Sequence, residues 1–83
     1  MGNTYLEKRA ERGKQNYTAI MAACRDLGLS FQQFERRGVI RVLARQGVMV
    51  EFFPKAGRYS IPSKNHWGRL TDPRELLENL SHA

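Results

Sequence analysis

Apolar and small residues recur along the first third of the chain at steps of three and four. The members of this seam are Leu6, Ala10, Gly13, Tyr17, Ile20, Cys24 and Leu27. The spacing predicts a helix over residues 4–27, because it places these side chains on one helical face. Gly13 is unfavourable in a helix interior, so the alternative is two helices that break within residues 13–16. Gly28 then supplies a stop at the C-terminal end.

A second helical pattern follows. Ser30 and Gln33 fit a capping box, in which each side chain satisfies a free backbone N–H group. Apolar or small residues then recur with helical spacing at Phe31, Phe34, Gly38 and Val42. We therefore predict a helix from Phe31 to Gln46 that stops at Gly47. Ile40 does not lie on the apolar stripe of this predicted helix.

The pattern then changes to that of strands. Residues 48–53 are rich in β-branched and aromatic side chains, and residues 58–61 alternate between apolar and polar. A Pro-Lys-Ala-Gly turn separates them, so the two segments predict a β-hairpin with a basic tip. We expect a polar loop over residues 63–70. A last short helix begins at Asp72, with Pro73 in its first position.

The order helix, glycine-containing turn, helix, hairpin resembles the winged helix-turn-helix family over residues 17–62. Members of that family have a small residue in the first helix, which Ala23 or Cys24 matches, and a glycine in the turn, which Gly28 matches. The apolar and capping residues that follow the turn correspond to Leu29 and Ser30, and a core position of the second helix corresponds to Phe34. Residues 43–50 followed by residues 57–61 look like the family's passage into its wing. The resemblance implies an α+β fold, a small helical domain with one β-hairpin, and a helix from Ser30 that lies in a DNA major groove.

In that arrangement, amide and basic side chains of the second helix would contact bases. Lys55 and Arg58 of the hairpin would contact phosphates or reach an adjacent minor groove, and the basic residues of the following loop would hold phosphates. The candidate nucleic-acid-binding residues are Gln32, Gln33, Arg36, Arg37, Arg41, Lys55, Arg58, Lys64 and Arg69. Gln can recognise adenine and Arg can recognise guanine through paired hydrogen bonds. Any one of these side chains could instead belong to an ordinary solvated face, so the prediction rests on their sum.

The charge distribution supports this interpretation. The 83 residues predict one small domain over 1–83, with 14 Lys and Arg against 8 Asp and Glu and a net charge of +6. Residues 1–71 hold thirteen basic and five acidic side chains, a net of +8, and residues 72–83 have a net of −2. A basic body is expected of a protein that binds DNA or RNA. A basic body would equally suit a protein that binds an acidic protein surface.

Trp67 lies in a basic segment and has two interpretations. Its ring could stack on an exposed base, or it could cap the small core beneath a loop, and the single Trp of a small domain favours the structural role. Trp67 and the off-stripe Ile40 are also candidate contacts for a protein partner. Ile40 and the seam of residues 6–27 are candidate contacts of a homodimer.

The residues that catalysis requires are sparse. Cys24 lies on the apolar seam, which indicates a buried core thiol, and His66 and His82 are the only histidines. No spacing resembles a zinc site or a phosphate-binding loop, so we expect no catalytic activity, no metal and no cofactor. A lone cysteine, no signal-peptide pattern and no spanning segment predict a cytoplasmic protein that does not enter a membrane.

These observations predict a small basic nucleic-acid-binding protein, a DNA-binding regulator or accessory factor of a prokaryote or mobile element. The alternative is a small non-enzymatic inhibitor that docks on a larger protein or nucleoprotein complex.

Overall fold

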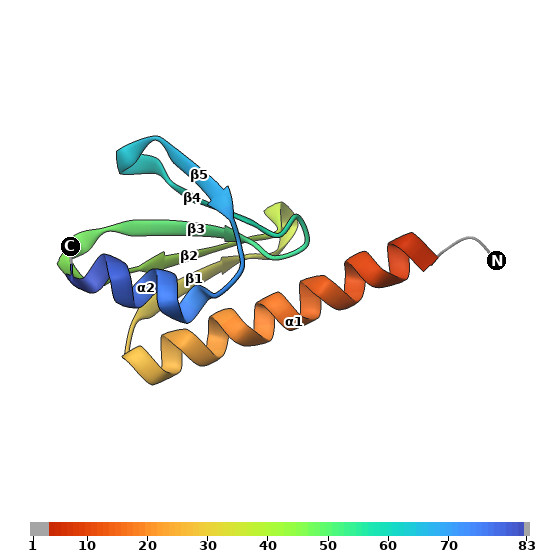
Figure 1. Ribbon diagram of the computed structural model, residues 1–83, viewed down its shortest axis with the longest axis horizontal. Coiled ribbons are helices and arrows are strands. Elements are labelled where there is room, and N and C mark those ends of the chain that lie inside the picture. Colours follow the sequence, from red (N-terminus) through yellow and green to blue (C-terminus); the bar gives the residue numbers. More distant parts are fainter. Residues whose placement is uncertain (1–3, 83) are drawn as a thin grey trace.

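A long helix, α1 (Thr4–Leu27), and a short C-terminal helix, α2 (Pro73–His82), pack on one face of an antiparallel sheet (Figure 1). The computed structural model describes residues 4–82, with the side chains of residue 8 and residues 10–80. The strands are neighbours in chain order: β1 (Ser30–Phe34), β2 (Val39–Leu43), β3 (Met49–Phe53), β4 (Arg58–Ile61) and β5 (His66–Arg69). The α+β class is therefore confirmed.

The pairing of β2 with β3 decides which side chains face the helices. Ile40 pairs with Phe52 and Val42 with Val50, and all four are buried. Arg41 lies between Ile40 and Val42 in β2, so its side chain points to the other face, because successive strand residues alternate. The helices complete the core with Ile20, Ala23, Cys24, Leu77 and Leu80. No helix of residues 4–82 packs on the opposite face of the sheet, which we call the open face (Figure 1).

The predicted helix from Phe31 to Gln46 is wrong. That segment forms β1, a 3₁₀ turn at Glu35–Arg37, and β2. The run Val39-Ile40-Arg41-Val42-Leu43 is rich in β-branched residues, which suit a pleated strand better than a helix. Ile40, which did not fit the helical stripe, is a core residue of the strand. The winged-helix arrangement is not confirmed, because the segment that would be its recognition helix is a hairpin.

Three hairpin loops share one geometry. Each has four residues, and the backbone N–H of the last donates to the carbonyl of the first: Gly38 to Glu35 at 3.1 Å, Gly57 to Pro54 at 3.3 Å and Asn65 to Pro62 at 3.1 Å. The last residue has a positive φ in every case, 64° at Gly38, 67° at Gly57 and 49° at Asn65. Gly and Asn tolerate this left-handed conformation, so they set where the strands turn.

Helix α1 is continuous, which settles the choice between one helix and two. Gly13 lies inside it and is buried, and a Cβ there would lie 3.0 Å from Cγ of Lys55. The glycine therefore permits close contact between α1 and the β3–β4 loop. The helix ends as predicted before Gly28, where Leu29 N–H donates to the Cys24 carbonyl at 2.9 Å. The side chains of Leu6 and Arg9 lie outside the described residues.

The end of the chain is partly as predicted. Helix α2 begins at Pro73, and the backbone N–H of Glu75 donates to Oδ1 of Asp72 at 3.2 Å.

The predicted hairpin is confirmed as β3 and β4. The polar loop predicted over residues 63–70 is wrong, because it contains β5, which pairs with β4. Among the described residues, neither helix has the length and apolarity needed to cross a membrane.

Replacing Gly38 tests the hairpin directly. Gly38→Ala should lower the free energy of unfolding by about 1 kcal/mol, because Ala is strained at a φ of 64° although the space around it is open. In the helix predicted from the sequence, the same change would stabilise the protein by about 0.5–1 kcal/mol. Thermal unfolding should show a midpoint lowered by about 4–8 °C.

Gly38→Asn is the matched control, since Asn65 adopts the same conformation in the β4–β5 loop. It should lose clearly less than Gly38→Ala. A rise in the midpoint for the alanine variant would contradict the hairpin.

Candidate functional site

Basic side chains from separate elements gather at one end of the sheet, which we call the basic end. They are Arg12 and Lys14 of α1, Arg36 and Arg37 of the β1–β2 loop, Lys55 of the β3–β4 loop, Arg58 at the start of β4 and Arg69 at the end of β5. A meander places the β1–β2 and β3–β4 loops at the same end, where α1 passes them (Figure 1). All seven side chains are exposed.

Hydrogen bonds hold this end together through its backbone. Asn16 Nδ2 donates to the Pro54 carbonyl at 2.8 Å, which ties α1 to the β3–β4 loop. The Leu70 N–H donates to the Gly57 carbonyl at 2.9 Å, which ties the end of β5 to the same loop. The basic side chains are therefore carried by a fixed frame, although they belong to distant parts of the sequence.

Within the described part of the chain, none of the seven basic side chains of this end forms a salt bridge. Glu11 and Glu35 also lie at this end, and Asp72 and Glu75 border a hollow together with Arg69. The acids that do form salt bridges lie elsewhere: Asp26, Glu51 and Glu78. Arg58 and Arg69 are direct cross-strand partners. Two like charges in that position repel each other, so this pair costs folding stability.

Aromatic side chains lie beside the basic end on the open face. Trp67 stacks on Phe53, with ring centroids 5.3 Å apart and planes inclined by 26°. Trp67 is nevertheless 59% exposed. Alternation along β5 places Trp67 and Arg69 on the same face. The open face near the basic end thus combines an exposed ring with two arginines that form no salt bridge in the described part of the chain.

Arg41 occupies the middle of the open face and is already engaged. Its Nε donates to Oε2 of Glu51 at 2.9 Å, and its guanidinium carbon lies 4.9 Å from the centroid of the Phe34 ring. These contacts indicate that Arg41 has a structural role within the open face. Gln32, its cross-strand neighbour, is exposed on the same face.

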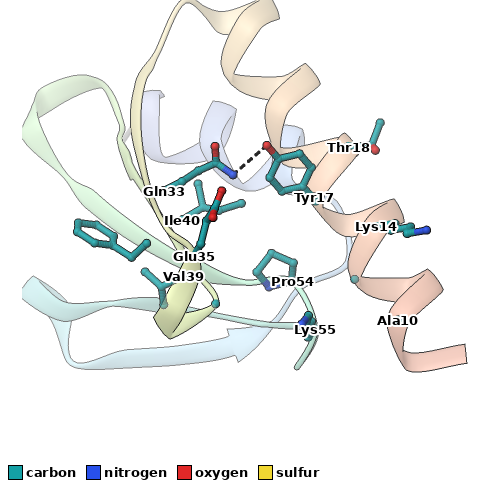
Figure 2. A pocket seen from close by; sticks show the side chains of 13 residues that line it. Ala10, Lys14, Tyr17, Thr18, Gln33, Glu35, Val39, Ile40, Pro54 and Lys55 are labelled. Atoms are coloured by element: carbon teal, nitrogen blue, oxygen red, sulfur yellow. Dashed lines mark hydrogen bonds between the residues drawn. The ribbon is translucent and has the colours of Figure 1, made fainter. Parts of the chain in front are cut away.

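A groove of about 690 Å³ lies on the helical side of the sheet at the same end, between α1 and the β1–β2 loop (Figure 2). Gln33 reaches across it and donates from Nε2 to the Tyr17 hydroxyl at 2.8 Å. The amide of Gln33 is therefore used within the protein. The groove is mainly apolar, and Lys14 and Lys55 are its basic lining residues.

The structure separates the other predicted site residues from this group. Lys64 lies in the β4–β5 loop, at the opposite end of the sheet. Ile40 is 3% exposed, so the prediction that it contacts a partner is wrong. The prediction that the helical seam forms a dimer contact is also wrong at Ile20 and Cys24, because both side chains belong to the core.

Sequence reasoning missed Phe53 and the pairing of Arg58 with Arg69. A strand interpretation of residues 66–69 would have placed Trp67 and Arg69 on one face, since they are two residues apart. The Trp67 ring also lies on the open face, away from the core, so its predicted role as a core cap is wrong.

The groups considered for catalysis have structural surroundings. Cys24 is 1% exposed, as expected for a core thiol, and burial raises its pKa. His66 Nε2 lies 3.2 Å from the Tyr59 hydroxyl. Across the described residues, no group of three His, Cys, Asp or Glu side chains is placed to hold a metal ion. His82 lies outside the residues with described side chains.

Comparison of the chain with protein-family models, curated proteins and solved structures finds no match.

The opposed arginines give a test of this electrostatic arrangement. Arg69→Glu should raise the free energy of unfolding by about 0.2–1 kcal/mol, because it replaces a repulsive cross-strand pair by an attractive one. The gain should be measurable as a higher thermal midpoint at 20 mM salt and should shrink at 1 M salt. Arg69→Gln, which only removes the repulsion, should fall between the variant and the original protein. A lower midpoint for Arg69→Glu at low salt would contradict this account.

Proposed function

We propose that the protein is a small nucleic-acid-binding module. Its contact surface is the basic end together with the adjoining half of the open face. The observation that carries the proposal is the pair Arg58 and Arg69, which face each other across strands with no salt bridge in the described residues, beside the exposed ring of Trp67.

The electrostatics favour a polyanion. Seven exposed basic side chains, none of which forms a salt bridge among the described residues, form a positive end. Phosphates would relieve the repulsion that these side chains exert on each other, and binding would release counterions from the nucleic acid. The cost that the arginine pair imposes on folding is then offset in the complex.

The sheet is a better candidate than a helix for contact with bases. The winged-helix resemblance assigned groove contacts to Gln32, Gln33, Arg36 and Arg37, but a hairpin carries these residues. Gln33 is bonded to Tyr17 on the helical side, whereas the aromatic residues lie on the open face. Arg36 and Arg37 remain suited to phosphate contacts from the β1–β2 loop.

Binding of a labelled 20-nucleotide strand and a 20-base-pair duplex at 50 and 200 mM salt tests the proposal. Affinity for at least one of them should fall steeply with salt, about a thousandfold if six phosphates are contacted. The double variant Arg58→Gln, Arg69→Gln should lower the affinity at least about tenfold and reduce the salt slope by about two.

The matched control removes two positive charges at the other end of the molecule, by Arg25→Gln and Arg45→Gln. It should change the affinity less than about threefold, because the end of α1 and the β2–β3 loop lie at the end of the sheet opposite the basic end. Equal losses in both double variants would mean that only net charge matters. No binding of either nucleic acid at 50 mM salt would refute the proposed function.

Docking on an acidic protein surface is the second candidate. Trp and Arg are the commonest hot-spot residues of protein interfaces. Two apolar side chains are also exposed near the opposite end, Phe31 at 45% and Leu43 at 46%. They border a hollow of about 260 Å³. Tighter binding to polyglutamate than to either nucleic acid, at the same salt, would favour this function.

A further inference from the structure

We propose that the nucleic acid is held as a single strand, with one unpaired base stacked on the outer face of Trp67. This inference rests on the proposed function and names its substrate class. It follows from the way in which the ring of Trp67 is supported, exposed and flanked by charge.

The support of the ring comes from the strand next to it. Trp67 pairs with Ser60 on β4, and Ser60 is 5% exposed. The small side chain of Ser60 leaves room for the Trp67 ring to reach across β4 and stack on Phe53 of β3. Stacking on Phe53 favours this orientation of the ring before any ligand arrives, which lowers the entropy that binding would cost.

The exposure of the ring is unusual for a structural role. Phe53 covers one side of the ring, yet 59% of Trp67 remains in solvent. The outer π face is thus the exposed one. A base can stack there and bury apolar area on both partners. A tryptophan that only stabilised the fold would gain more by burying that area within the protein.

The charges next to the ring match the chemistry of a nucleotide. Arg69 lies two residues from Trp67 on the same face of β5, and Arg58 is opposite Arg69. A strand whose base stacks on Trp67 would hold its phosphates beside these guanidinium groups. The basic side chains of the β1–β2 and β3–β4 loops continue the charge beyond them.

A duplex cannot use this arrangement in the same way. Its bases are stacked on each other and offer only their edges to the grooves. Stacking on a protein ring requires an unpaired base, as in sheet-based platforms that bind single strands. The position of Trp67 therefore favours a single strand over a duplex.

Trp67 is the only tryptophan of the chain, so its intrinsic fluorescence reports on this site alone. A 12-nucleotide oligothymidine should quench the emission with the same midpoint as binding measured by anisotropy. A hairpin duplex with the same number of phosphates should bind more weakly and leave the emission nearly unchanged. Oligouridine of the same length distinguishes RNA from DNA as the preferred strand.

Trp67→Ala should weaken single-strand binding by about fivefold to a hundredfold, the range that corresponds to stacking of one base. Its effect on duplex binding should stay below about twofold. Trp67→Phe should keep a large part of the affinity, because an aromatic ring remains. Leu43→Ala is the matched control, since it removes another exposed apolar side chain from the same face near the other end.

The outcomes separate the two proposals. If neither nucleic acid binds at 50 mM salt, the proposed function fails. If both bind equally and the emission does not change, the function stands and the single-strand proposal is overturned. The quenching experiment needs no variant, so the proposal can be refuted even if Trp67→Ala fails to fold. Equal losses for Trp67→Ala and Leu43→Ala would also refute it.

Discussion

The pairing of β2 with β3 is the contact on which the rest of the molecule depends. It places Ile40, Val42, Val50 and Phe52 against the two helices and Arg41 and Glu51 on the open face. A shift of one residue would exchange the two faces and put the charged pair into the core. Because this pairing buries four apolar side chains and leaves Arg41 and Glu51 accessible on the open face, the register is strongly specified. The same register fixes where β4 and β5 lie, and with them the side chains of the proposed site.

The meander topology then collects charge that the sequence spreads over more than fifty residues. Alternate loops of an antiparallel meander lie at the same end, so the β1–β2 loop and the β3–β4 loop come together beside α1. Salt bridges to Asp26, Glu51 and Glu78 engage arginines elsewhere. Within the described residues, the basic side chains of the basic end form no salt bridge. The net charge of the chain is thus less informative than its distribution over the fold.

Stability and the proposed function oppose each other at this surface. A domain of 83 residues has a small core and a small margin of stability. It nevertheless keeps two arginines opposite each other and more than half of its only tryptophan in solvent. Neither feature contributes to the core, which lies on the other side of the sheet. Their position beside each other is the reason to interpret them as parts of one binding surface.

The sequence alone determined the elements whose patterns are local. The seam of α1, the stop before Gly28, the turn between β3 and β4, and the Asp72 cap of α2 each depend on residues close in the chain. The basic character and five of the seven residues of the basic end were also visible, whereas Arg12, Lys14 and Phe53 were not among the candidates. Residues 31–46 were predicted to form a helix, because Phe31, Phe34 and Val42 fit a helical stripe as well as a strand. Only the tertiary structure decided between them: pairing with β3 buries Ile40 with Phe52, a contact between distant residues that outweighs local spacing. The same long-range pairing brought Arg58, Arg69 and Trp67 to one surface, which no local pattern could specify.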